Sequence, residues 1–166
     1  MNVTLNDIEK HSPCKSGWQK LLKNLGKTKA DDEPLPLVTI LDSNGLNDAL
    51  WCLRALPPEL DGKIRLFNCL IAEHALKYWE AVYPDDKRPH EAIAVSRRFA
   101  VGKATQKELE VSLSVARSAA RSAQSDSQSA ALFAALSGAS DARSAESAAR
   151  SAETTAQEKL FREYWA

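Results

Sequence analysis

Histidine and cysteine are the side chains in this sequence best suited to holding a metal ion. The candidates are His11, Cys14, Cys52, Cys69 and His74. Their spacing fits no standard zinc pattern, and on a helix Cys69 and His74 would point about 140° apart. We therefore predict that these are ordinary half-buried residues and that the protein holds no metal.

Nucleophilic catalysis requires a serine, threonine or cysteine beside a base. Serines are abundant, but the sequence contains neither a Gly-x-Ser-x-Gly elbow nor a glycine-rich phosphate loop. Acidic clusters occur at Asp31–Glu33 and Asp85–Asp86, close to prolines. Such clusters are more typical of solvated turns than of paired catalytic carboxylates. The sequence thus predicts no catalytic residues, no cofactor and no enzyme.

A basic segment from Lys10 to Lys29 carries six lysines and no acidic residue. Lysines such as Lys20 and Lys23 could bind the phosphates of a nucleic acid. The whole chain is balanced, however, with 22 basic and 22 acidic residues. We therefore favour the solvated face of an amphipathic helix and keep nucleic-acid binding as an alternative.

The elements that position these residues are predicted to be helices. Apolar residues recur at helical spacing over about 16–25, 46–56, 64–83 and 89–101. Gly26, Pro57–Pro58, Pro84 and Gly102 are the expected stop signals. The stretch 64–83 is the most hydrophobic, so we expect it at the centre of the core.

One short run, Leu37 to Leu41, resembles a strand. Without a second run to pair with, it is interpreted as an extended segment or the start of a helix.

The last third of the chain is rich in alanine and serine, which make up 27 of the 45 residues from Ser112 to Ala156. Thr105 to Glu108 has the pattern of a capping box that opens this segment. A heptad stripe starts at Leu109 and Leu113, and a second stripe, out of phase with the first, follows Gly138. This pattern predicts a helical hairpin that turns near Gly138.

These features together predict an all-α, single-domain helical bundle with a long C-terminal Ala/Ser-rich hairpin. We expect a helical core with an N-terminal extension over residues 1–104, and the hairpin, packed on that core, over residues 105–166.

Large apolar residues occur near the end of the chain, at Phe161, Tyr164 and Trp165. They are candidate anchors for a partner, and docking onto the protein's own core is an equal alternative. Arg117 and Arg121 form a short basic row that is also a candidate contact, although solubility and salt bridges are the simpler explanation.

Three cysteines at wide spacing do not suggest a disulfide framework. The first residues show no secretory pattern, and no run of 18 apolar residues occurs. We expect a cytoplasmic protein without a membrane segment.

Several motifs of this chain resemble the putative immunity protein domain family, found in bacterial polymorphic-toxin loci and in many phage and prophage proteins. The resemblance extends over about Leu41 to Leu160. It is carried by Asp48-Ala-Leu-Trp-Cys-Leu-Arg-Ala-Leu56, Arg65-Leu-Phe67, Arg88-Pro89 with Glu91-Ala-Ile93, and the Ala/Ser/Arg-rich tail. Residues 14–18 and 26–32 resemble a phage-type N-terminal extension.

The resemblance implies a helical protein that neutralises a bacterial toxin, a defence component or another effector by stoichiometric binding. An immunity protein and a phage anti-defence inhibitor are both compatible with it. Two other functions remain open. One is a nucleic-acid-associated protein that uses residues 10–29, and the other is a structural protein that oligomerises through the Ala/Ser seam.

Overall fold

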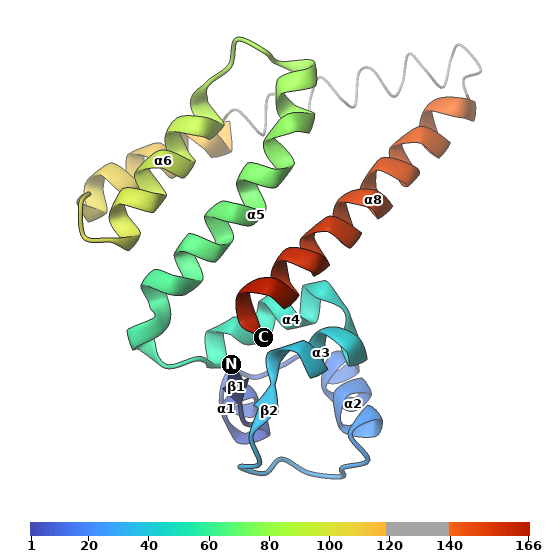
Figure 1. The fold of residues 1–166 in the computed structure, drawn as a ribbon. Helices are drawn as coiled ribbons and strands as arrows, with labels where there is room; N and C mark the ends of the chain where they lie inside the picture. The colour runs from blue at the N-terminus through green and yellow to red at the C-terminus, as the bar shows by residue number, and fades with distance from the viewer. Residues whose placement is uncertain (119–139) are drawn as a thin grey trace. The chain divides into compact units, whose positions relative to one another are not determined.

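The structure, a computed structural model, describes residues 1–118 and 140–166, with the backbone alone for residues 75, 78, 81 and 140–152 (Figure 1). The described chain is mostly helical and contains a two-stranded sheet. It divides into two compact units. Unit 1 comprises Met1–Asp61 and Thr154–Ala166, and unit 2 comprises Gly62–Glu153.

Unit 1 is built from short elements. They are β1 (Asn2–Val3), α1 (Leu5–Lys10), α2 (Lys15–Asn24), β2 (Leu35–Pro36), α3 (Leu37–Asn44), α4 (Leu46–Cys52), the 3-10 turns η1 (Leu53–Ala55) and η2 (Pro58–Leu60), and the last part of α8 (Ser140–Trp165). The strands β1 and β2 are antiparallel, with Val3 opposite Leu35, and both of these side chains are buried. Buried leucines and isoleucines from α1 to α4, such as Ile8, Leu21 and Ile40, form the core.

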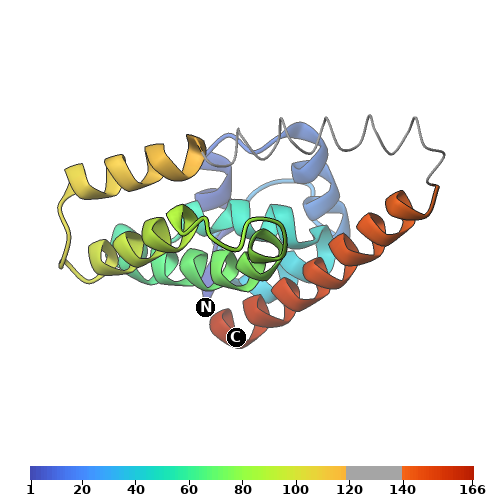
Figure 2. The same cartoon turned by 90° about the horizontal axis from the view of Figure 1, so that it is seen from above.

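The end of α8 belongs to this core. Phe161 and Trp165 are 0% and 1% exposed. The ammonium of Met1 donates to the Trp165 carbonyl oxygen at 3.0 Å, and Arg162 pairs with Asp42 of α3. Both views accordingly show the two ends of the chain next to each other (Figures 1 and 2).

Unit 2 contains α5 (Asp61–Val82, its first residue lying in unit 1), α6 (Arg88–Ala100), a helix over residues 106–118 and the first part of α8. In Figures 1 and 2, α5 and α6 lie side by side. Arg97 of α6 forms a two-bond ion pair with Glu73 of α5, and His90 contacts Glu80 at 2.8 Å. At Gly62 a Cβ would lie 2.9 Å from the Ala100 carbonyl oxygen, so glycine permits this close approach.

The predicted helices are confirmed, with small shifts at their ends. The expected helix over about 46–56 is α4 followed by η1, and the strand-like run at Leu37 is the start of α3, one of the two outcomes predicted for it. Gly26 and Gly102 end their helices with φ of 67° and 72°. In both turns a 6→1 hydrogen bond closes the helix, from Lys27 N–H to the Leu22 carbonyl and from Lys103 N–H to the Arg98 carbonyl.

Two features were not predicted. The β1–β2 pair uses only two residues per strand, too few to show alternation. Helix α1 has six residues, and its signal is local: the Thr4 hydroxyl accepts from the Asp7 N–H at 3.0 Å.

The expectation that 64–83 forms the centre of the core holds only for part of α5. Phe67 and Cys69 are buried, but Val82, near the end of this stretch, is 66% exposed. Among the side chains that the structure describes, most of the buried ones lie in unit 1, where short elements contribute one to three residues each.

The predicted hairpin is only partly described. Residues 106–118 and 140–165 are helical, in agreement with its two arms. The turn at Gly138 and most of the heptad stripe lie outside the described residues. The proposed boundary between residues 104 and 105 stays a prediction.

None of the described helices combines the length and the apolar character needed to cross a membrane.

Replacing Phe161 by alanine should lower the free energy of unfolding by about 3–5 kcal/mol, because a fully buried aromatic side chain is removed from a packed core. Urea denaturation followed by circular dichroism measures this loss. Glu163→Ala, an exposed position on the same helix, is the matched control and should change stability by less than about 0.5 kcal/mol. Equal effects of the two substitutions would contradict the placement of Phe161.

Candidate functional site

A groove of about 400 Å³ lies in unit 2 between α6 and the helix over residues 106–118. Its apolar part consists of an alanine and a valine of α6 and two valines of the second helix, and charged side chains surround them. The lining residues are Arg88, Glu91, Ala92, Val95, Arg98, Thr105, Lys107, Glu108, Val111, Ser112 and Val115.

Part of the apolar surface of this groove is exposed to solvent. Val111 is 56% exposed and Val115 is 40% exposed, whereas Ala92 is 6% exposed. Val111 and Val115 are four residues apart, so they lie on one face of their helix. The groove therefore has a buried floor and an exposed apolar wall.

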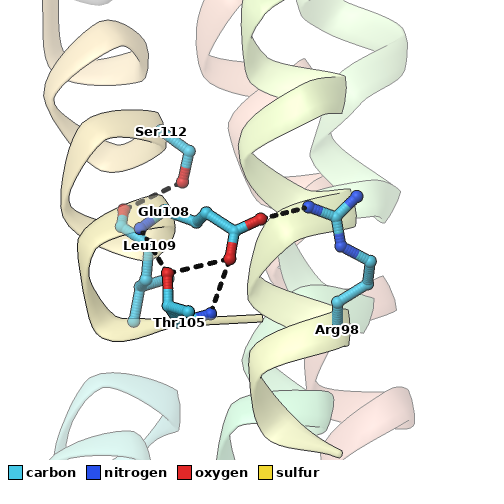
Figure 3. A network of polar contacts seen from close by, with 5 residues as sticks. All are labelled: Arg98, Thr105, Glu108, Leu109 and Ser112. Carbon is cyan, nitrogen blue, oxygen red and sulfur yellow. Dashed lines mark hydrogen bonds and ion pairs between the residues drawn. The ribbon is translucent and has the colours of Figure 1, made fainter. Parts of the chain in front are cut away.

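The second wall is fixed at its start by the predicted capping box (Figure 3). The Glu108 N–H donates to the Thr105 hydroxyl at 3.2 Å. The Glu108 carboxylate accepts in return from the Thr105 N–H at 2.7 Å and from its hydroxyl at 2.8 Å. The capping box is thus confirmed, and it satisfies backbone donors that the first helical turn leaves without partners.

Glu108 also connects the two walls. Its other carboxylate oxygen accepts from Arg98 of α6 at 3.4 Å, as Figure 3 shows. The hydrogen bonds from Thr105 hold the pKa of Glu108 below its ordinary value of 4.5, and the charge of Arg98 acts in the same direction. The carboxylate is therefore ionised at neutral pH and available to Arg98.

Another ion pair stands at the far end of α6. Asp86 accepts from the Arg88 side chain at 2.8 and 2.6 Å and from its backbone N–H at 3.1 Å. These bonds lower the pKa of Asp86, the side-chain bond most strongly. The groove thus has Arg88 and Arg98 on its α6 side, each held by an acidic partner.

The basic residues predicted as partner contacts belong to different units. Lys20 and Lys23 are exposed on α2, and the Lys20 ammonium donates to the Asn44 carbonyl oxygen at 3.3 Å. Arg117 is exposed on the helix that forms the groove wall, two residues beyond Val115. Arg121 lies outside the described residues. The structure does not bring the lysines together with Arg117 in one unit.

The aromatic candidates at the end of the chain are mostly buried. Phe161 and Trp165 belong to the core of unit 1, and Tyr164, half-buried, makes an edge-on ring contact with Trp165 at 5.1 Å. Burial favours the alternative in which these residues dock onto the protein's own core. Contact of this group with a partner stays a prediction, and Tyr164 has the most surface left for it.

The residues considered as metal ligands do not form a cluster. Within the described part of the chain, no group of three or more histidine, cysteine or acidic side chains is arranged to hold a metal ion. All three cysteines are free thiols, with Cys14 exposed and Cys52 and Cys69 buried.

The sequence analysis did not predict a role for Val111 and Val115. The heptad stripe that it identified starts at Leu109 and Leu113, and Leu109 is buried. The two valines repeat the same spacing two residues later, on another face. A second apolar pair off the main stripe was the available signal.

Replacing Thr105 by alanine should lower the free energy of unfolding by about 0.5–2 kcal/mol, because the helix loses its N-terminal side-chain cap. The pKa of Glu108 should rise towards 4.5, since one of the bonds that lowers it is removed. NMR titration of the Glu108 side chain measures this shift.

The sign of the pH effect follows from the lowered pKa. The stabilisation by ionised Glu108 is complete above pH 4.5 and is lost as the pH falls through the lower folded-state pKa. Thr105→Ala should therefore cost more stability at pH 7 than in strong acid. A loss that does not depend on pH, with an unchanged Glu108 pKa, would contradict the role of the capping box.

Comparison with known proteins identifies the segment that contains the groove. The family model described as Imm-5 like putative immunity protein matches residues 62–152. A search of curated proteins and a search of solved structures each returned no match.

The matched segment begins in α5 and covers fewer residues than the resemblance inferred from the sequence, which extends over about Leu41 to Leu160. It contains the motifs at Arg65–Phe67 and Arg88–Ile93 and excludes the one at Asp48–Leu56. It covers more than half of the 166 residues, and every residue that lines the groove lies inside it. The chain belongs to the Imm-5 like putative immunity protein family.

Proposed function

We propose that this protein is a non-enzymatic immunity protein that neutralises a bacterial toxin by binding it stoichiometrically, with the groove between α6 and residues 106–118 as its contact surface. The observation that carries the proposal is the position of the groove: its lining lies entirely within the segment that matches the immunity family. Direct binding is the activity that the family description implies.

The exposed valines support a contact surface. Val111 and Val115 are both large and apolar and are left open to solvent beside the buried Ala92. Adjacent exposed apolar residues with a polar rim are typical of protein-binding sites. Burying them under a partner would gain about 25 cal/mol for each Å² of apolar surface removed from water.

The charged residues around the groove support selective binding of one partner over non-specific binding of many proteins. Arg88 and Arg98 form ion pairs with Asp86 and Glu108 on the α6 side of the groove. Charges around an apolar centre favour a partner with complementary charges and penalise others. Glu91 and Lys107 add one charge of each sign to the lining.

The family match supports a toxin as the target and adds nothing to the expected phage or anti-defence role. Lys20 and Lys23, the residues considered for nucleic-acid binding, lie on α2, outside the segment that matches the family. The oligomerisation alternative depends on the Ala/Ser seam, most of which lies outside the described residues. We therefore propose the groove, and neither of these alternatives, as the surface that binds the partner.

A neutralisation assay tests the proposal. Toxin domains encoded beside the gene for this chain are expressed in a bacterial host with and without the chain. Co-expression should restore growth, and the purified pair should elute as a complex of fixed stoichiometry with the toxin chemically unmodified. Rescue that needs only substoichiometric protein, or that leaves a modified toxin, would instead indicate an enzyme.

Two valine substitutions test the contact surface. Val111→Asp with Val115→Asp should weaken toxin binding at least tenfold, because two carboxylates are placed in the apolar part of the groove. Binding is measured by isothermal titration calorimetry. Val82→Asp is the matched control: Val82 is 66% exposed, lies in the same unit and does not line the groove.

The control variant should bind like the unmodified protein. Urea denaturation should give similar unfolding midpoints for the unmodified protein, the double variant and the control, since the substitutions replace exposed side chains. Unchanged toxin binding by the double variant would move the contact surface away from the groove.

A further inference from the structure

Unit 1 contains a second hollow, which is smaller and of a different chemical character. This pocket of about 130 Å³ lies among α1, α2, α3 and α4. Its walls include the indole side chains of Trp18 and Trp51 and aliphatic side chains such as Ile8 and Leu21. It lies outside the residues that match the immunity family, and its lining shares no residue with the groove.

The pocket contains one charged side chain. Among its lining residues Asp48 supplies the one carboxylate, Cys14 and Cys52 supply thiols, and none is a lysine, arginine or histidine. One Asp48 oxygen accepts from the Asn44 side-chain N–H at 2.8 Å, and the same Asn44 amide donates to the Gly17 carbonyl oxygen at 2.9 Å. Asn44 therefore holds the carboxylate in a fixed position.

Within the described residues, Asp48 has no cationic side chain as an ion-pair partner. In the part of the chain that the structure describes, none of the ion pairs includes this carboxylate. Asp48 lies in the first turn of α4, where the helix dipole favours a negative charge. The dipole explains why a carboxylate is tolerated there, and the lining of the pocket itself includes no lysine or arginine.

The neighbouring groups give the pocket a low polarity. Cys52 is 4% exposed, and burial, followed by the charge of Asp48, raises the pKa of its thiol to about 12. The thiol is therefore neutral at physiological pH and does not compete with Asp48 for a cation. Trp51 also contacts a cationic side chain that does not line the pocket. The Arg54 guanidinium carbon lies 4.2 Å from the centroid of the Trp51 ring.

The backbone at Gly17 leaves room for the carboxylate. A Cβ at this position would lie 2.9 Å from Asp48 Oδ2 and 3.1 Å from Cys14 Sγ. Any larger residue would displace Asp48 or fill the pocket. Glycine at position 17 thus keeps the acidic end of the pocket open.

We propose that this pocket binds a small organic cation, an ammonium or guanidinium group on a short apolar chain. The Asp48 carboxylate supplies the counter-charge, and the tryptophans supply the surface on which organic cations are favoured. The volume limits the guest, since drug-sized ligands need about 300–1,000 Å³ and a cavity of about 150 Å³ holds a molecule of benzene size.

A titration with n-butylammonium chloride tests this site in the full-length protein. The four tryptophan indole N–H signals in a ¹⁵N-labelled sample report on binding. Trp18 and Trp51 should shift in a saturable manner, whereas Trp79 and Trp165, which do not line the pocket, should stay unchanged. Shifts of all four signals in proportion, without saturation, would overturn the proposal.

Two comparisons isolate the charge. The neutral 1-butanol should bind at least tenfold more weakly than butylammonium, and sodium butyrate should not bind. Asp48→Asn keeps the shape of the side chain and should also weaken butylammonium binding at least tenfold. Equal binding of 1-butanol and butylammonium to the unmodified protein would overturn the proposal even if the variant failed to fold.

A further arm distinguishes the source of the cation. N-acetyl-lysine methylamide presents the same ammonium as part of a polypeptide. Binding within tenfold of butylammonium would support a lysine side chain of another protein as the guest. Its exclusion, with butylammonium still bound, would support a free amine. Failure of both probes to bind would overturn the proposal.

Discussion

The groove of unit 2 depends on one sharp reversal of the chain after α6. Gly102 adopts a φ of 72°, a conformation that costs a glycine little, and the Lys103 N–H closes the end of the helix on the Arg98 carbonyl. Thr105 and Glu108 then open the next helix at once. The side chain of Arg98 donates to the Glu108 carboxylate as well. The reversal is therefore stabilised both by a backbone hydrogen bond and by an ion pair. Val95 and Val111 line one groove as a result.

Local signals made much of this fold readable from the sequence. The turns at Gly26 and Gly102 end helices, and the capping box at Thr105–Glu108 begins one. These signals are local, because the hydrogen bonds involved join residues at most five positions apart. The helices of unit 2 were therefore predictable within a few residues.

Tertiary packing accounts for most of what the sequence did not reveal. Val3 and Leu35 pair across 32 residues in strands too short to show a pattern. The periodicity of α5 suggested a central helix, yet it could not show that Val82 would remain exposed. The placement of Phe161 and Trp165 was left open for the same reason, because burial depends on which other element covers them.

The two units present different chemistry. Unit 2 carries the family match and offers an apolar groove bordered by charges of both signs, a surface suited to another protein. Unit 1 surrounds a small pocket in which Asp48 is held by Asn44 beside two tryptophans. The groove could be partly anticipated, through its capping box and α6. The pocket could not, since Trp18 and Asp48 are 30 residues apart and nothing in their spacing brings them together.

Hydrogen–deuterium exchange of the protein with and without the toxin it neutralises tests the central claim most directly. If the groove is the contact surface, exchange should slow in α6 and in residues 106–115 when the toxin is bound, and α1 and α2 should be unchanged. Slower exchange confined to α1 and α2, with α6 and residues 106–115 unaffected in a complex that is fully formed, would contradict the account.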